Sequence, residues 1–177
     1  ISGTGVNTAS VFGGTISDNR SWPDFVDDLL AAGKRLPTDL EFQSLAIGSN
    51  EETNIDGSAD PVTTGSHSDT AARRMVSNIG CEDCCGAMMQ WLWDQSFRVD
   101  GIDFVTPADP SWAWSASLGN KGALYRQGTA GDVKLVAGGA WDDGTHCGSR
   151  CRDMGNNRGA TSAVIGGRGV GEHKEVL

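Results

Sequence analysis

The stretch "GCEDCCGAMMQWLWDQ", residues 80–95, contains the pattern that decides the fold. In its second half, Met89, Trp91 and Trp93 occupy every other position. Side chains of a β-strand alternate between its two faces, so this spacing predicts a strand with both indoles on one face. Aromatic residues in such a pattern are typical of a protein core, and we expect Trp91 and Trp93 to be buried.

A helix is predicted upstream of this strand, in "SWPDFVDDLLAAG", residues 21–33. Its apolar residues recur at positions i, i+3, i+4, i+7 and i+8, which is the pattern of an amphipathic helix. Ser21 is the expected N-cap, Pro23 fits the first turn, and Gly33 fits the end of the helix.

A second short helix is predicted in "RLPTDLEFQSLA", residues 35–46. Thr38 and Glu41 have the spacing of a capping box, in which each side chain bonds an otherwise free backbone amide. The polar, turn-rich residues 48–69 follow as a long loop, and we expect a loop of that length to be functional or mobile rather than part of the scaffold.

Short apolar runs separated by glycines predict further strands downstream. They are "SWAWS" (111–115), "ALYRQG" (123–128), "VKLVAGGAW" (133–141) and "TSAVIGGRGV" (161–170). A length of 177 residues suits one domain. The sequence therefore predicts a single, loop-rich α+β domain over residues 1–177, with two early helices and a twisted, mostly antiparallel sheet.

The charge and hydropathy exclude some partners. The formal net charge is −9 and the sequence pI is about 4.6, whereas nucleic-acid binding depends on clustered Lys and Arg. Nor does any apolar run approach the roughly 20 residues that a membrane-spanning helix needs. We therefore expect neither a nucleic-acid partner nor membrane insertion.

The five cysteines form two groups, "CEDCC" and "CGSRC". A zinc site is one interpretation, because C-x2-C and C-x3-C pairs can meet at tetrahedral geometry. Its ligands would be Cys81, Cys84, Cys147 and Cys151. The spacing departs from the usual zinc pattern, and buried free thiols or one disulfide between the groups are favoured. We expect no cofactor.

Three stretches carry a resemblance to known proteins. "GCEDCCGAMMQWLWDQ" and "RLPTDLEFQSLA" resemble two elements of the C-type lectin-like fold shared by formylglycine-generating enzymes and the variable proteins of diversity-generating retroelements. The tail "GGAW…GSR…GGRGVGEH" resembles the end of the bacteriophage tropism determinants, which belong to those variable proteins. The resemblance implies a C-type lectin-like fold and a ligand-binding surface whose coding segment is rewritten by adenine-directed mutagenesis.

Under this resemblance, residues of about 138–170 form the variable region. Every residue from Asp142 to Arg158 except Met154 can be reached from an AAY asparagine codon by replacing adenines. The implied ligand-contacting residues are Ala140, Asp142, Gly144, His146, Asp153, Gly155, Asn156, Ala160, Ser162, Val164 and Ile165. Codon reasoning alone adds Asp143, Cys151 and Asn157.

A rewritable surface needs a backbone that does not depend on the rewritten side chains. The expected fixed frame consists of Trp141, Gly148, Ser149, Arg150, Gly166, Gly167, Arg168, Gly169 and Val170. A surface of this kind binds through adaptable polar contacts together with any aromatic residue that a variant acquires, and this copy has acquired none.

The function implied by the resemblance is that of an adhesin or viral tropism determinant on a virion or cell surface. Its partner would be an exposed receptor, with a protein as the expected class, and its oligomeric state is left open. An ordinary solvated loop is the plainer interpretation of the variable region. In that interpretation His146 is simply a solvated histidine, and His173 belongs to the closing strand.

Three other functions remain as alternatives. A formylglycine-generating type of enzyme would use Cys147 and Cys151, with Arg150 and Arg152 supplying positive charge, although we do not expect an enzyme. A fixed calcium-dependent lectin would use acids such as Asp56, Asp60, Asp142 and Asp143. A structural virion protein would show no concentrated coding variation in its tail.

Overall fold

The computed structural model describes residues 1–98, 113–126 and 131–171. Two α-helices precede the sheet, α1 (Trp22–Ala31) and α2 (Asp39–Ala46), and both match the predicted helices. Short 3-10 turns occur at η1 (Gly5–Asn7), η2 (Asp56–Ser58) and η3 (Gly144–His146). Within the described part of the chain, no helix has both the length and the apolar character that crossing a membrane requires.

Within the described residues, six strands form one mixed sheet in the order β2-β3-β5-β4-β1-β6. Three strand pairs are antiparallel (β1 with β4, β4 with β5, and β2 with β3), while β3 with β5 and β1 with β6 are parallel. The predicted α+β class with a mostly antiparallel sheet is confirmed. The strands are β1 (Met89–Arg98), β2 (Ala113–Trp114), β3 (Leu124–Arg126), β4 (Gly131–Gly138), β5 (Gly148–Asp153) and β6 (Ile165–Gly166).

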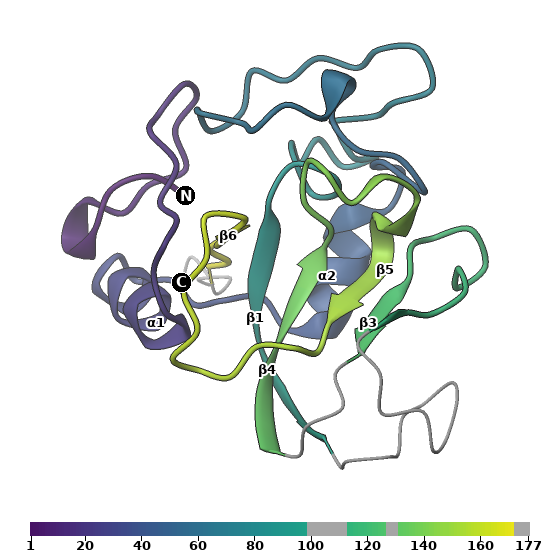
Figure 1. Ribbon diagram of the computed structural model, residues 1–177. Coiled ribbons are helices and arrows are strands. Elements are labelled where there is room, and N and C mark those ends of the chain that lie inside the picture. Colours follow the sequence, from purple (N-terminus) through teal and green to yellow (C-terminus); the bar gives the residue numbers. More distant parts are fainter. Residues whose placement is uncertain (99–112, 127–130, 172–177) are drawn as a thin grey trace, which may run out of the picture.

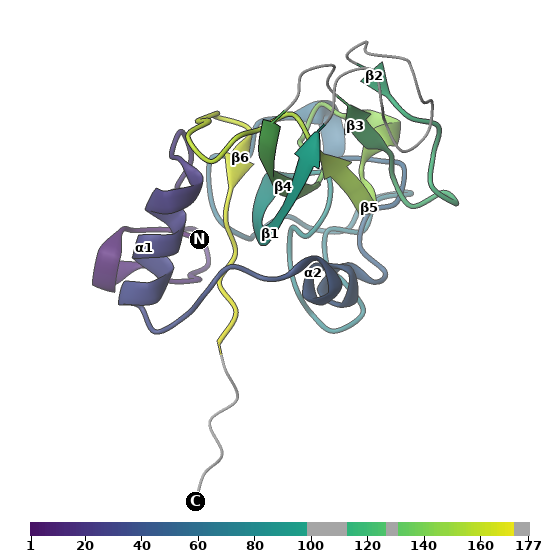
Figure 2. The same cartoon turned by 90° about the horizontal axis from the view of Figure 1, so that it is seen from below.

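The two helices contact different parts of the sheet. Figures 1 and 2 together show α2 behind the central strands and α1 beside β6. Phe42 and Ala46 of α2 pack with Leu92 and Ala137 of the sheet. On the other side, α1 packs into a second core cluster that contains Trp91 and Val136. The sheet face opposite α2 is therefore covered by α1 only near the β6 edge.

Polar side chains at the helix starts explain why these segments are helical. In α1, the backbone amide and the hydroxyl of Ser21 both donate to the Asp24 carboxylate, at 2.9 and 2.6 Å. In α2, the amide of Thr38 donates to Glu41 at 2.8 Å, which completes the predicted capping box. Leu30 is 57% exposed, so the apolar face of α1 is narrower than its sequence pattern suggests.

Strand β1 departs from the predicted alternation. Trp91 lies opposite Val136 and Gln95 lies opposite Lys134, so the segment from Trp91 to Gln95 has two more residues than the segment of β4 that it pairs with. The amide of Trp93 bonds the carbonyl of Pro37 at 2.9 Å instead of β4. As a result Trp91 is fully buried while Trp93 is 43% exposed, and the prediction that Trp93 belongs to the core is wrong.

The later strands are shorter than the sequence pattern suggests. The run 161–170 contributes only β6, and of the "SWAWS" run the structure describes Ala113 and Trp114 as β2. Trp112 and His173 lie outside the described residues. Strand β5 was not predicted, because glycine, serine and charged residues dominate its sequence.

The capping box of α2 predicts a pH-dependent stability. Arg35 binds both carboxylate oxygens of Glu41 at 2.7 Å, and this pair, with the Thr38 amide, lowers the pKa of Glu41 from 4.5 to about 2. A carboxylate with a lowered pKa stabilises the fold above its unfolded pKa and loses that effect as the pH falls through its folded value. We expect E41Q to be less stable than the parent near neutral pH, with a difference that shrinks between pH 4.5 and about 2.

Urea unfolding at a series of pH values measures this difference. The control is D27N, at an exposed residue of α1, which should change stability little at any pH. An E41Q deficit that stays constant from neutral pH to pH 2 would contradict the assignment.

Candidate ligand-binding site

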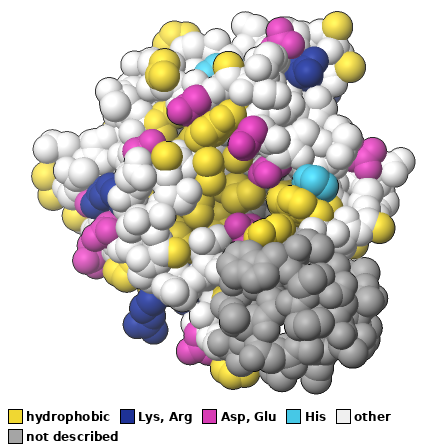
Figure 3. Space-filling view, viewed as in Figure 1, with side chains coloured by type: hydrophobic (Ala, Val, Ile, Leu, Met, Phe, Trp, Pro, Cys, Tyr) yellow, Lys and Arg dark blue, Asp and Glu magenta, His cyan; other side chains and the backbone are white. Residues whose placement is uncertain are grey.

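The sheet face opposite α2 has a buried aromatic and aliphatic base. Trp91 and Val136 are fully buried there, and above them pack the partly buried Trp114, Trp141 and Val164. Figure 3 shows this side of the molecule, with hydrophobic side chains gathered at its centre and carboxylates around them. It is a partly apolar surface with an acidic surround.

Two loops of the predicted variable region lie around this base. The first loop, residues 139–147, contributes Trp141 to the edge of the core cluster, and the second loop, residues 154–164, contributes Ala160 and Val164. Strand β5 separates the two loops in sequence. Because residues of both loops pack on the same core cluster, the structure brings the two halves of the predicted contact set to one region.

Most of the predicted contact residues are at least partly exposed, but Ala140, Cys151 and Ile165 are buried, with exposed fractions of 1%, 0% and 1%. Ala140 and Ile165 belong to the core cluster beneath the loops, and Cys151 lies within β5, between β3 and β4. Enclosure of these three side chains argues against their contacting a ligand. The partly or fully exposed members are Asp142, Asp143, Gly144, His146, Asp153, Gly155, Asn156, Asn157, Ala160, Ser162 and Val164.

The first loop is held through its backbone carbonyls. The carboxamide of Asn54 donates to the carbonyl of Trp141, and the amide of Glu52 donates to that of Cys147 at 2.9 Å. The amide of Ala123 donates to the carbonyl of His146 at 3.0 Å. Two of these donors come from residues 48–69, so part of that loop is scaffold, contrary to the expectation of a functional or mobile segment.

The second loop is held in the same way. Backbone amides outside the variable region donate to its carbonyls at 2.9–3.2 Å. The pairs are Lys134 to Asn156, Trp22 to Arg158, Asn19 to Ser162, and Met89 to Val164. A carbonyl remains an acceptor whatever side chain its residue carries, so these bonds do not depend on the sequence of the loop.

Several predicted frame residues make contacts suited to a fixed role. The hydroxyl and amide of Ser149 donate to the two oxygens of Glu51, at 2.8 and 3.2 Å. A Cβ on Gly148 would lie 2.2 Å from the carbonyl oxygen of Lys121, which leaves no room for a side chain. A Cβ on Gly167 would lie 2.6 Å from the Phe25 ring.

The two arginines of the predicted frame differ. Arg168 is partly buried, and its Nε donates to Gln90 Oε1 at 2.9 Å while Nη2 donates to the carbonyl of Glu82. Arg150 is exposed and its guanidinium donates to the Leu118 carbonyl at 3.4 Å. Arg168 thus links the end of the variable region to β1 through a hydrogen bond, whereas Arg150 lies on the surface of the protein.

An aromatic cluster beside the first loop was missed at the sequence level. The His146 imidazole stacks on the Trp114 indole with ring centroids 4.3 Å apart and an interplanar angle of 5°. Tyr125 lies against the same indole at 5.1 Å. Partial burial raises the pKa of Tyr125, and the carboxylates of Asp153 and Asp143 raise it further. Trp114 and Tyr125 lie outside the variable region, so no codon argument could have identified them.

The cysteines are free thiols, and all except Cys81 are buried. Burial raises the pKa of Cys84 to about 11 and also raises that of Cys85, Cys147 and Cys151. Among the residues that the structure describes, no three His, Cys, Asp or Glu side chains are grouped to hold a metal. The favoured interpretation of buried free thiols fits, whereas neither the zinc set nor the calcium set is assembled.

The two arginines near Cys147 and Cys151 do not offset the effect of burial on the pKa of these thiols. Arg152 donates to Asp39 on α2 at 2.5 Å and packs over the Phe42 ring, on the far side of the sheet. Arg150 bonds the Leu118 carbonyl. Thiol catalysis needs a depressed pKa and an accessible sulfur, and neither thiol has either.

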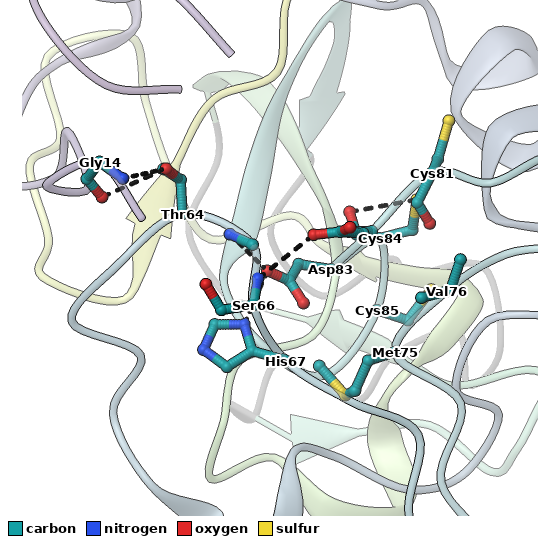
Figure 4. Close-up of polar contacts among 12 residues, drawn as sticks. Gly14, Thr64, Ser66, His67, Met75, Val76, Cys81, Asp83, Cys84 and Cys85 are labelled. Carbon is teal, nitrogen blue, oxygen red and sulfur yellow. Dashed lines mark hydrogen bonds and ion pairs between the residues drawn. The ribbon is translucent and has the colours of Figure 1, made fainter. Parts of the chain in front are cut away.

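A cavity of about 440 Å³ lies between the N-terminal segment, residues 80–83 and residues 166–170. Figure 4 shows the polar contacts beside it, where the His67 ring lies against the Asp83 carboxylate. His67 Nδ1 is 2.8 Å from Asp83 Oδ2, and burial raises the pKa of Asp83. The exposed predicted contact residues do not line this cavity.

Known proteins resemble this chain in sequence and in fold. No protein-family model matches it. Over 156 residues it is 31% identical to a tail fiber receptor-binding protein of Bordetella phage BPP-1, in an alignment that covers 86% of this chain and 37% of that protein. The chain thus spans less than half the length of this relative.

Solved structures of the Major Tropism Determinant share the fold. Its U1 variant matches with a TM-score of 0.63 at 25% identity, covering 89% of this chain and 44% of the other. Its M1 variant matches with a TM-score of 0.60 at 29% identity, covering 86% and 37%. The predicted C-type lectin-like fold and the predicted resemblance to phage tropism determinants are confirmed.

Backbone anchoring of the first loop predicts a contrast between two substitutions. N54A removes the donor to the Trp141 carbonyl and should cost about 1–3 kcal/mol of unfolding free energy, because a partly buried acceptor loses its partner. D142A, at an exposed predicted contact residue, should change that free energy by less than about 0.5 kcal/mol. Urea unfolding monitored by tryptophan fluorescence compares the two, and equal losses would refute the anchoring role of Asn54.

The burial of the thiols predicts their reactivity. In the folded protein a thiol-reactive dye should label Cys81 rapidly, and the four buried cysteines only after unfolding. Mass spectrometry of peptides after brief labelling identifies the modified residue. Rapid labelling of Cys147 or Cys151 in the folded state would instead support the enzyme alternative.

Proposed function

We propose that this chain, as a single C-type lectin-like domain over residues 1–177, is the receptor-binding part of a phage tail fiber. Residues of about 138–170 would form a ligand-contacting surface that a diversity-generating retroelement rewrites. The observation that carries this proposal is the anchoring of both loops through backbone carbonyls by donors outside the variable region. The similarity to a tail fiber receptor-binding protein and to the Major Tropism Determinant supports the same conclusion.

The partner we propose is a receptor exposed on a host cell, with a protein as the expected class, which would place the chain on the virion surface. The contact residues would come from the two loops around the base formed by Trp91 and Val136. We propose the partly or fully exposed residues of the predicted set and exclude Ala140, Cys151 and Ile165, since their side chains are enclosed.

A binding role, rather than catalysis, fits the chemistry of the site. The thiols that an enzyme of the formylglycine-generating type would use are buried, and their pKa values are raised. The partly or fully exposed members of the contact set are carboxylates, carboxamides, the imidazole of His146, glycines and small side chains around an apolar centre. Surfaces of that composition suit adaptable recognition of a macromolecule.

Natural sequence variation tests the retroelement. Deep sequencing of the gene in its natural population should find substitutions concentrated at template-adenine codons between about residues 140 and 165, with a reverse transcriptase and a template copy in the neighbouring DNA. Because Ala140, Cys151 and Ile165 are buried, variation at these three positions should be restricted to small or apolar residues. Uniform low variation and no nearby template would reject the proposal.

Binding to host cells tests the surface itself. The double variant D142R/N157R places bulky side chains at exposed positions of both loops, and we expect it to lose binding of the labelled protein to host cells. The matched control is L40R, at an exposed residue of α2 on the opposite side of the sheet, which should bind as the parent does. Equal binding by all three proteins would mean that this face does not contact the receptor.

A further inference from the structure

The aromatic cluster at β2 and β3 joins a fixed part of the fold to a rewritable one. Trp114 and Tyr125 are directly opposite each other in the β2–β3 pair, and cross-strand aromatic pairs of this kind stabilise each other. His146 approaches from η3, within the first loop, and stacks on the indole. The position of Trp114 is therefore set by the sheet, whatever residue stands at 146.

The residue at 146 covers part of the Trp114 ring. The two rings are nearly parallel at 4.3 Å, so the imidazole occupies one indole face as a flat ligand group would. Position 146 belongs to the predicted variable set. Smaller residues at this position would leave that indole face to an incoming group, whereas histidine covers it.

The charges around the aromatic cluster indicate the chemical class of the group that would stack on Trp114. Besides burial, which has the largest effect, the carboxylates of Asp153 and Asp143 raise the pKa of Tyr125, and Asp142 lies beside Asp143 at an exposed position. Of the cations whose contacts the structure describes here, Lys121 pairs with Glu51 at 3.6 Å and Arg150 bonds the Leu118 carbonyl. An aromatic face in an acidic surround favours a cation, and a guanidinium combines positive charge with a plane that stacks.

We propose that Trp114 and Tyr125 form a fixed aromatic anchor that, with Asp142 and Asp143, accepts an arginine side chain of the receptor, and that residue 146 sets how much of the Trp114 ring is available. This inference rests on the proposed receptor-binding function and deepens it. The anchor supplies the aromatic contact that the rewritable segment lacks. Aromatic residues at the centre of an interface commonly carry much of its binding energy.

Peptides that differ in one charge test the anchor directly. The probes are the acetylated, amidated pentapeptide Gly-Ser-Arg-Ser-Gly and the same peptide with citrulline, which has nearly the shape of arginine but no charge. Titration is followed through the indole N–H resonances of the full chain, with W114F used to assign that of Trp114. The arginine peptide should shift the Trp114 resonance at millimolar concentration, and the citrulline peptide should bind roughly three- to tenfold more weakly.

Three variants refine this test. W114A should weaken binding of the arginine peptide by about threefold or more, and H146A should strengthen it because the indole face is uncovered. W93A is the matched control, since Trp93 is also accessible but its ring packs on Trp22 and belongs neither to the β2–β3 pair nor to the first loop. Circular dichroism checks that W114A is folded, and W114F, which keeps an aromatic face, should bind between the parent and W114A.

Equal affinity for the arginine and citrulline peptides, or an unchanged affinity in W114A, would overturn the proposal. The host-cell assay separates this failure from failure of the proposed function. If W114A binds cells as the parent does while D142R/N157R does not, the anchor is wrong and the receptor-binding surface stands. If neither variant loses cell binding, the proposed function fails and the anchor fails with it.

Discussion

The structure depends on one constraint: the loops of the variable region are positioned through their backbone carbonyls. The donors are the backbone amides of residues in the sheet, of Ala123 just before β3 and of residues in the N-terminal half of the chain, together with the carboxamide of Asn54. A backbone amide is present at every residue except proline, and the accepting carbonyl at every residue. Side chains can thus change along both loops while the hydrogen bonds that anchor the loops to the rest of the fold remain.

The constraint is effective because the donors themselves are rigid. Met89 and Lys134 belong to the central strands, and Trp22 begins α1. Glu52 and Asn54 lie in irregular backbone, yet Ile55 bonds the carbonyl of Gly86 at 2.8 Å and Asn50 is buried among Met75 and Cys85. The long loop before the sheet therefore behaves as a support for the first variable loop, and its irregular shape follows from the surface it supports.

Local sequence signals predicted the helices. The features that could not be predicted from the sequence depend on long-range packing. The capping residues around Ser21 and Thr38 act within one turn, so both helices could be read from sequence. The irregular pairing that exposes Trp93 depends on a bond to Pro37, far away in the chain, and no alternation pattern contains it. Strand β5 has little β-propensity in its own sequence and is held by β3 and β4 on either side.

In the candidate site, too, the residues that the codons allow differ from those that the fold accepts. Codon reasoning treats Cys151 and Asp153 alike, but Cys151 is enclosed within β5 while Asp153 is partly exposed at the end of that strand. An asparagine at 151 would bury a carboxamide that needs several hydrogen-bond partners, at a cost of about 1–3 kcal/mol if they were missing. That a template codon can produce a given residue is therefore not enough to place that residue in a binding surface. Burial of its side chain narrows the variation that the fold accepts, and position 151 favours a small, weakly polar residue such as the cysteine present here.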